Sequence, residues 1–216
     1  MLAALIVASL LSCSPVVTVS SPAVINVAAD STLQATFDKG VTFQQFVDAA
    51  VARREGWLRL QRDAMIPAGL VARARSVGDK WQLLVVARDA CGDSMNSVPY
   101  AARLADSVPG LSLRIVSPND GQLAQGAHRT QDGRMATPTF VLLDARGADV
   151  GCLVELPAPL RRWTDAARAT VSNDSLHSYR STFYERDRGV SLATELVEML
   201  ESAQAGTPRC DRQLTR

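Results

Sequence analysis

The sequence predicts one α/β domain in which short buried strands alternate with helices. Apolar runs at 82–87 and 111–116 have the length of strands, and a segment with helical spacing separates them. Two further strands are indicated at 139–143 and 150–156, joined by a turn signal at 144–147. The chain has 216 residues, 47% of them hydrophobic, which is enough for one good core.

Helices are expected before, between and after these strands. Residues 42–64 repeat apolar side chains such as Phe43, Val47 and Trp57 at helical spacing, which predicts an amphipathic helix. The remaining helical segments in chain order are 68–76, 94–107, 119–127, 160–171 and 188–202. A polar loop is expected at 128–136.

Cys91 lies where a buried strand passes into a helix, and three residues separate it from the end of the apolar run. The N-terminus of a helix offers unpaired N–H groups and a partial positive charge, which favour a thiolate over a thiol. Many cysteines are simply small buried residues that do no chemistry. The corner position favours the alternative, a reactive thiol at Cys91.

The three residues after Cys91 each have a chemical and a structural interpretation. Gly92 would let a partner chain approach the sulfur closely. Asp93 suits the helix start as a cap or first-turn acid, but a charge close to the sulfur would oppose the thiolate. Ser94 would donate a hydrogen bond to the thiolate or serve only as a helix-start serine.

Pro99 stands eight residues after Cys91, and Thr137-Pro138 precedes the strand at 139–143. This spacing around Cys91 resembles that of the thioredoxin superfamily. The motif Cys-Gly-Asp-Ser is similar to that of a bacterial subgroup with a single active-site cysteine, and the resemblance extends over residues 37–201. It implies a three-layer fold with a central mixed sheet of about four strands flanked by helices, preceded by a helical extension.

The resemblance also implies a site and an activity. A cis peptide at Thr137-Pro138 would lie beside Cys91 and expose the Thr137 backbone to an extended substrate, whereas the simpler alternative is a proline that starts an edge strand. Arg134 matches an arginine of the subgroup and would meet an anionic oxidised sulfur, whereas the simpler alternative is a solvated loop residue. The implied activity is thiol–disulfide exchange with protein or small-molecule partners, without a cofactor.

Two positions depart from the family pattern. Ala90 stands where the family usually has tryptophan, and Ser94 stands where a dithiol enzyme keeps its resolving cysteine. These residues favour a monothiol mechanism or, as the alternative, a redox-inactive module that binds proteins or peptides.

The other cysteines show no paired spacing, so neither a disulfide-stapled scaffold nor a zinc ribbon is predicted. Cys152 is expected roughly across from Phe140, too far from Cys91 for a direct bond, and is interpreted as a small core residue. Residues 204–216, which include Cys210, are expected to form a loose tail. From this tail Cys210 could pair with Cys152 or with another molecule. Cys91 is the expected free thiol.

The N-terminus predicts export. Residues 1–12 have the length and composition of a secretory leader, and Leu-Leu-Ser-Cys at 10–13 resembles a bacterial lipobox. Cys13 would then carry the lipid anchor, and residues 13–40 would form a flexible tether to a domain at 41–203. No Lys or Arg precedes the apolar run, so another exported form and a merely apolar N-terminus stay open. The expected location is the periplasm or outer surface.

Charge and histidine content argue against other classes of partner. The net charge is +1 with both signs interspersed, so no nucleic-acid partner is expected. The two histidines, His128 and His177, lack metal-ligand spacing and are expected on the surface or in loops. No metal site is predicted.

Overall fold

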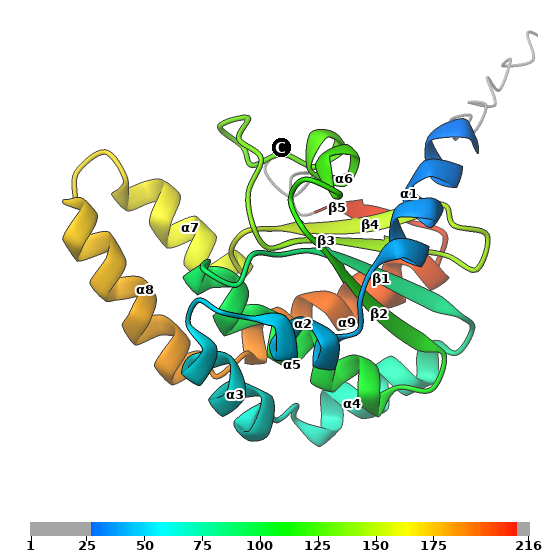
Figure 1. The fold of residues 1–216 in the computed structure, drawn as a ribbon, viewed down its shortest axis with the longest axis horizontal. Coiled ribbons are helices and arrows are strands. Elements are labelled where there is room, and N and C mark those ends of the chain that lie inside the picture. Colours follow the sequence, from blue (N-terminus) through cyan, green and yellow to red (C-terminus); the bar gives the residue numbers. More distant parts are fainter. Residues whose placement is uncertain (1–26, 211–216) are drawn as a thin grey trace, which may run out of the picture.

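A five-stranded mixed sheet forms the centre of the molecule in the computed structural model, which describes residues 27–210 (Figure 1). The strands lie in the order β2-β1-β3-β4-β5. β1 pairs with β2 in parallel, β3 is antiparallel to both β1 and β4, and β5 is parallel to β4. The strands are β1 Trp81–Val86, β2 Leu111–Val116, β3 Thr139–Leu143, β4 Asp149–Val154 and β5 Arg209–Cys210.

Helices cover both faces of this sheet (Figure 1). The helices are α1 Val27–Lys39, α2 Phe43–Ala49, α3 Arg54–Asp63, α4 Ala68–Val77, α5 Gly92–Ser107, α6 Gln122–Ala127, α7 Ala158–Ala167, α8 Asn173–Asp187 and α9 Val190–Gln204. On one face, helices α2, α3, α4, α5 and α9 bury Leu83, Val85 and Phe140. On the other, α1 and α6 cover Leu84 and Val141. The predicted three-layer α/β class is confirmed.

The helical extension differs from its prediction in having a break. The expected helix at 42–64 divides into α2 and α3, with a left-handed backbone at Arg53 (φ 55°) between them. The Arg54 guanidinium donates to the carbonyls of Val47, Asp48 and Ala50, which caps the end of α2. The break frees backbone N–H groups for contacts with the rest of the chain.

Ordered structure extends beyond the expected domain ends. Helix α1 lies within the expected tether and buries Leu33 and Phe37 against the sheet. Strand β5 lies within the expected tail and pairs with β4. Helix α8 was not predicted, because its hydrophobic side chains do not form one stripe along the helix.

The register of β4 also differs from its prediction. Cys152 pairs with Val141, not Phe140. The pairing shifts at a bulge between Leu142 and Leu143. A slip of one residue exchanges the two faces of a strand, and Cys152 therefore belongs to a small cluster with Ala136 and Val154.

Candidate functional site

Cys91 is the N-cap residue of α5, directly after the loop that leaves β1. Its backbone is extended (φ −80°, ψ 121°), and the Ser94 N–H donates to its sulfur at 3.4 Å. The side chain is half-buried, and within the described residues Cys91 is the free cysteine. Pro99 lies inside α5, as the spacing predicts. The sulfur therefore sits at the positive end of a four-turn helix.

The predicted cis peptide bond is present at Thr137-Pro138, next to the sulfur. The Cys91 thiol donates to the Thr137 carbonyl at 3.2 Å. The bend is held from both sides: the Gln125 amide donates to the Ala136 carbonyl at 2.6 Å, and the Glu155 N–H donates to the Pro138 carbonyl at 2.8 Å. Within the described residues, the Thr137 N–H has no hydrogen-bond partner.

The loop that leads into Cys91 is anchored by the helical extension. The Asp89 carboxylate accepts hydrogen bonds from the N–H groups of Val51 and Ala52 at 3.0 and 2.9 Å. These backbone hydrogen bonds lower the pKa of Asp89, and the one from the Ala52 N–H contributes most. The Trp57 indole donates to the Asp89 carbonyl at 2.9 Å, and the Arg53 guanidinium donates to the Ala90 carbonyl at 2.8 Å. Residues 51–57 thus position the approach to the thiol, a role that the sequence analysis missed.

Asp93 lies in the first turn of α5, and its carboxylate contacts α8. It accepts a hydrogen bond from the Tyr184 hydroxyl at 2.8 Å and pairs with Arg180 at 3.3 Å. Burial raises the pKa of Asp93, although the Arg180 charge and the Tyr184 hydroxyl both oppose this shift. The structural interpretation as a first-turn acid fits these contacts. Sequence reasoning missed Arg180 and Tyr184 because it did not identify α8.

Gly92 and Ser94 contact the site in different ways. A Cβ at Gly92 would meet nothing closer than the Arg53 guanidinium at 3.9 Å, so the chain itself does not require glycine there. Ser94 is fully buried and contributes its backbone N–H to the sulfur. Its hydroxyl has no hydrogen-bond partner in the described part of the chain.

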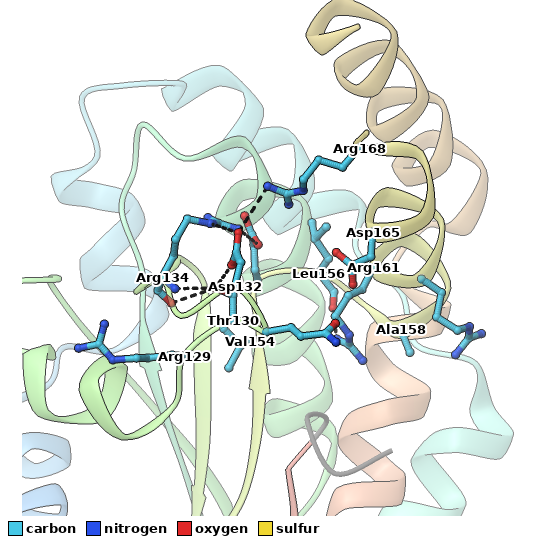
Figure 2. Close-up of a pocket in the computed structure, with 13 residues that line it drawn as sticks. Arg129, Thr130, Asp132, Arg134, Val154, Leu156, Ala158, Arg161, Asp165 and Arg168 are labelled. Carbon is cyan, nitrogen blue, oxygen red and sulfur yellow. Dashed lines mark hydrogen bonds and ion pairs between the residues drawn. The ribbon is translucent and has the colours of Figure 1, made fainter. Parts of the chain in front are cut away.

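A cavity of about 500 Å³ adjoins the cis-prolyl bend through Glu155, which lines it and whose N–H donates to the Pro138 carbonyl. Its walls are the 129–134 loop, the end of β4 and α7, and Figure 2 shows the side chains that line it. Five arginines and three acidic residues line it: Arg129, Arg134, Arg161, Arg162, Arg168, Asp132, Glu155 and Asp165. The wall therefore has an excess of positive charge.

Arg134 crosses this cavity wall as part of an ion-pair network. It contacts Asp132 at 2.8 Å and Glu155 at 3.1 Å, and Arg168 contacts Asp132 at 3.6 Å. The hydrogen bonds from Arg134 and Thr130 lower the pKa of Asp132 to about 2. Arg134 is thus paired with two carboxylates, and among the described residues it makes no hydrogen bond with the Cys91 sulfur.

The remaining cysteines and histidines correct several expectations. Cys152 and Cys210 form a disulfide, so Cys152 is not a simple core residue and the C-terminal segment is tied to the sheet. His128 lies in the loop after α6, one of its two expected positions, but at 8% exposed it is not on the surface, whereas His177 on α8 is exposed. Cys13 lies outside the described residues. No helix among residues 27–210 combines the length and hydropathy needed to span a bilayer.

Comparisons with known proteins identify the family through one family model and the fold through two solved structures. A family model described as thioredoxin matches residues 40–168, more than half of the chain. Among curated protein sequences, none matches this chain. The structure is similar to that of a protein of unknown function from Pseudomonas aeruginosa, with 20% identity and a TM-score of 0.61 over 78% of this chain and 96% of that one. It is also similar to an HIV epitope scaffold, with 18% identity and a TM-score of 0.60 over 78% of this chain and 97% of the scaffold.

Proposed function

The chain belongs to the thioredoxin family, and from this premise we propose that it carries out thiol–disulfide exchange through the single thiol of Cys91. The observation that carries the proposal is the position of the sulfur. It caps α5, accepts the Ser94 N–H and lies 3.2 Å from the Thr137 carbonyl. A thiolate formed there faces a helix N-terminus, the environment that favours nucleophilic cysteines.

The reaction proceeds in two exchanges. The Cys91 thiolate attacks one sulfur of a partner disulfide, forms a mixed disulfide with it and releases the other sulfur as a thiolate, which takes up a proton. A second, external thiol then attacks the mixed disulfide, bonds to the partner sulfur and restores Cys91. Because Ser94 replaces a resolving cysteine, this second thiol comes from outside the motif.

The substrate of this exchange is an acidic protein or small-molecule disulfide. Its backbone pairs with the unpartnered Thr137 N–H, as in strand addition. Beyond the cis-prolyl bend it reaches the cavity, whose arginines outnumber its acidic residues five to three. Positive charge in a partly enclosed wall raises the local concentration of anionic ligands.

The exchange takes place outside the cytoplasm, with the protein anchored by a lipid on Cys13. The apolar residues 1–12 and the lipobox-like sequence at 10–13 support this location. The Cys152–Cys210 disulfide supports it independently, because structural disulfides are typical of oxidising compartments. Metabolic labelling with an alkyne fatty acid should tag the full chain but not a Cys13→Ala variant. Equal labelling of the two would exclude this anchor.

The activity is tested with oxidised glutathione, which carries carboxylates. We expect wild type to form a glutathione adduct on Cys91, found by peptide mass mapping, and to release it on addition of a small thiol. The Cys91→Ser variant should form none at this position. Adduct formation slower than that of free cysteine under the same conditions would contradict the proposal.

The cavity is tested by changing the charge of the disulfide. Oxidised glutathione should react faster than cationic cystamine, and Arg162→Ala should reduce this ratio. High salt should reduce the ratio as well, because it screens exposed charges. A ratio unaffected by both changes would exclude charge selection by the cavity.

A redox-inactive binding module is the alternative function, favoured by Ser94 and Ala90. In that case the Thr137 backbone and the cavity bind a peptide, and the thiol takes no part. The rate of Cys91 alkylation as a function of pH separates the two functions. Fast reaction well below pH 8 supports exchange, whereas slow reaction with the profile of an ordinary thiol, whose pKa is about 8.5, supports binding alone.

A further inference from the structure

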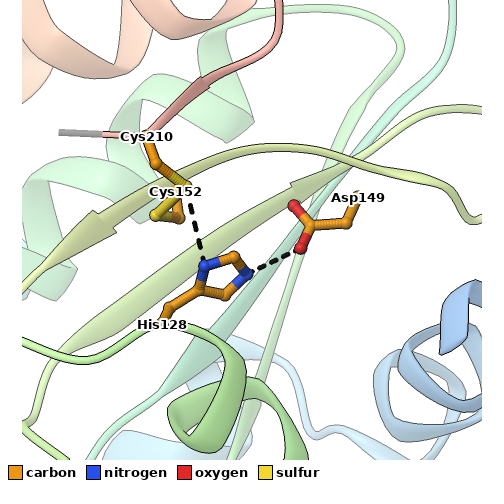
Figure 3. The surroundings of a disulfide bond; sticks show 4 residues. All are labelled: His128, Asp149, Cys152 and Cys210. Atoms are coloured by element: carbon orange, nitrogen blue, oxygen red, sulfur yellow. Dashed lines mark hydrogen bonds and ion pairs between the residues drawn. A yellow bond between two sulfur atoms is a disulfide. The ribbon is translucent and has the colours of Figure 1, made fainter. Parts of the chain in front are cut away.

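The Cys152–Cys210 disulfide lies beside a buried histidine, His128 (Figure 3). Cys152 belongs to β4, Cys210 to β5, and His128 is the C-cap residue of α6. The His128 Nδ1 atom lies 3.6 Å from the Cys210 sulfur. The two sulfurs and a ring nitrogen all lie within 4.8 Å of one another. The fold thus gathers three metal-ligand atoms that the sequence spacing does not group.

Asp149 orients the histidine ring from its other side. Its carboxylate lies 2.6 Å from the His128 Nε2 atom, and because a carboxylate accepts, Nε2 carries the proton. In the neutral imidazole, Nδ1 then carries the lone pair, and Figure 3 shows this side of the ring facing the Cys210 sulfur. A disulfide sulfur has no proton to donate, so this buried lone pair faces no donor there. A carboxylate behind a histidine is the usual support of a zinc-ligating ring.

We propose that reduction of this disulfide creates a zinc site whose ligands are the thiolates of Cys152 and Cys210 and Nδ1 of His128. Zinc prefers sulfur and imidazole ligands in tetrahedral geometry, with bonds of about 2.3 Å to sulfur and 2.0–2.1 Å to nitrogen. These bond lengths separate a ligating sulfur and nitrogen by about 3.6 Å, which matches the distance from the Cys210 sulfur to His128 Nδ1. The fourth position is open to water.

Disulfide and zinc exclude each other at this site. Two sulfurs on one tetrahedral zinc lie about 3.8 Å apart, which a covalent S–S bond does not permit. An external dithiol reduces the pair: its two thiols become a disulfide, and Cys152 and Cys210 become thiols. Binding of Zn²⁺ then displaces the two thiol protons to solvent. In the reduced protein, zinc would keep β5 joined to β4 in place of the covalent bond.

The test measures zinc binding by the full chain in both redox states, using the Cys91→Ser background to remove the other described thiol. After reduction with a phosphine and desalting without oxygen, zinc is titrated against a chromophoric chelator. We expect one tightly bound zinc in the reduced protein and none at this affinity in the oxidised protein. Zinc should also protect Cys152 and Cys210 from alkylation.

Ligand variants decide whether this cluster holds the metal. Cys210→Ser and His128→Ala should each weaken binding by at least about 100-fold, and Asp149→Asn by about 10- to 100-fold. His177→Ala, a histidine exposed on α8, should bind like the parent and serves as the matched control. The proposal is overturned if reduced parent and Cys210→Ser bind equally, if the oxidised protein binds as tightly, or if the reduced parent binds no zinc. None of these outcomes depends on the activity of Cys91.

Discussion

Cys91 precedes helix α5, whereas the Cys152–Cys210 pair joins two strands of the sheet, and the surroundings of the two sites differ. Cys91 is half-buried at the start of α5, beside a backbone N–H that has no partner in the described chain. The pair is covered by Ala136 and Val154 and closed by a covalent bond. The Cys91 thiol is free, whereas the sulfurs of Cys152 and Cys210 are bonded to each other. The position of each cysteine in the fold therefore distinguishes a free thiol from a cross-link.

The largest expected difference between the two sites is in alkylation of the unreduced protein. Iodoacetamide should modify Cys91 and leave Cys152 and Cys210 unmodified, because only a thiolate reacts and these two sulfurs are bonded to each other. Peptide mass mapping with and without prior reduction measures this. Modification of Cys152 before reduction, or an unreactive Cys91, would abolish the contrast.

Removing the covalent bond should have the second-largest effect, on stability. Cys210→Ser opens a link between residues 58 apart in sequence. The chain-entropy model assigns such a loop about 4 kcal/mol of unfolding free energy. Urea denaturation measures the loss, and Cys91→Ser should stay within about 1 kcal/mol of wild type. Similar losses in the two variants would show that the pair is no more structural than Cys91.

The contact between the start of α5 and α8 should contribute less. Tyr184→Phe deletes the hydroxyl that donates to the buried Asp93 carboxylate, at an expected cost of about 1–3 kcal/mol in unfolding free energy. Tyr179→Phe, on the same helix but stacked on Trp163 and 38% exposed, is the matched control and should cost less than about 0.5 kcal/mol. Equal costs would mean that the hydrogen bond to Asp93 does not support the site.

The smallest expected effect is the pH dependence that Asp93 confers. Because burial raises its pKa, the folded protein binds the Asp93 proton more tightly than the unfolded chain does. The free energy of unfolding of wild type should therefore fall, relative to that of Asp93→Asn, as pH rises above about 4, by at most about 1.4 kcal/mol per pH unit. Urea denaturation at several pH values checks this slope. A rise of wild type relative to the variant would contradict the direction of the shift.

The strand-to-helix corner and the cis-prolyl bend could be predicted because each depends on short-range signals. An apolar run before Cys91, a proline eight residues after it and a Thr-Pro before the next strand are all visible in the sequence. The contact between them follows from the thioredoxin topology that this pattern predicts. These features define most of the sheet, the start of α5 and the position of the sulfur.

The supporting contacts could not be predicted because they join distant segments. Asp89 meets Val51 and Ala52 only because α2 ends early, and neither residue has a distinctive neighbourhood. Disulfide partners are not determined by sequence alone, and the bulge at Val150 in β4 moved Cys152 by one position relative to its expected partner. Helix α8 lacks an apolar stripe, although its N-cap Ser172, which accepts from the Ser175 N–H, is a signal that could have located it.

The interruption between α2 and α3 has a consequence for transplanting the motif. Four hydrogen bonds from residues 51, 52, 53 and 57 converge on Asp89 and Ala90, immediately before the sulfur. A minimal fragment beginning at Trp81 would retain the entire Cys-Gly-Asp-Ser signature and lose all of these donors. Grafting the signature onto a foreign scaffold would lose the same hydrogen bonds, because their donors lie in a segment thirty-odd residues upstream.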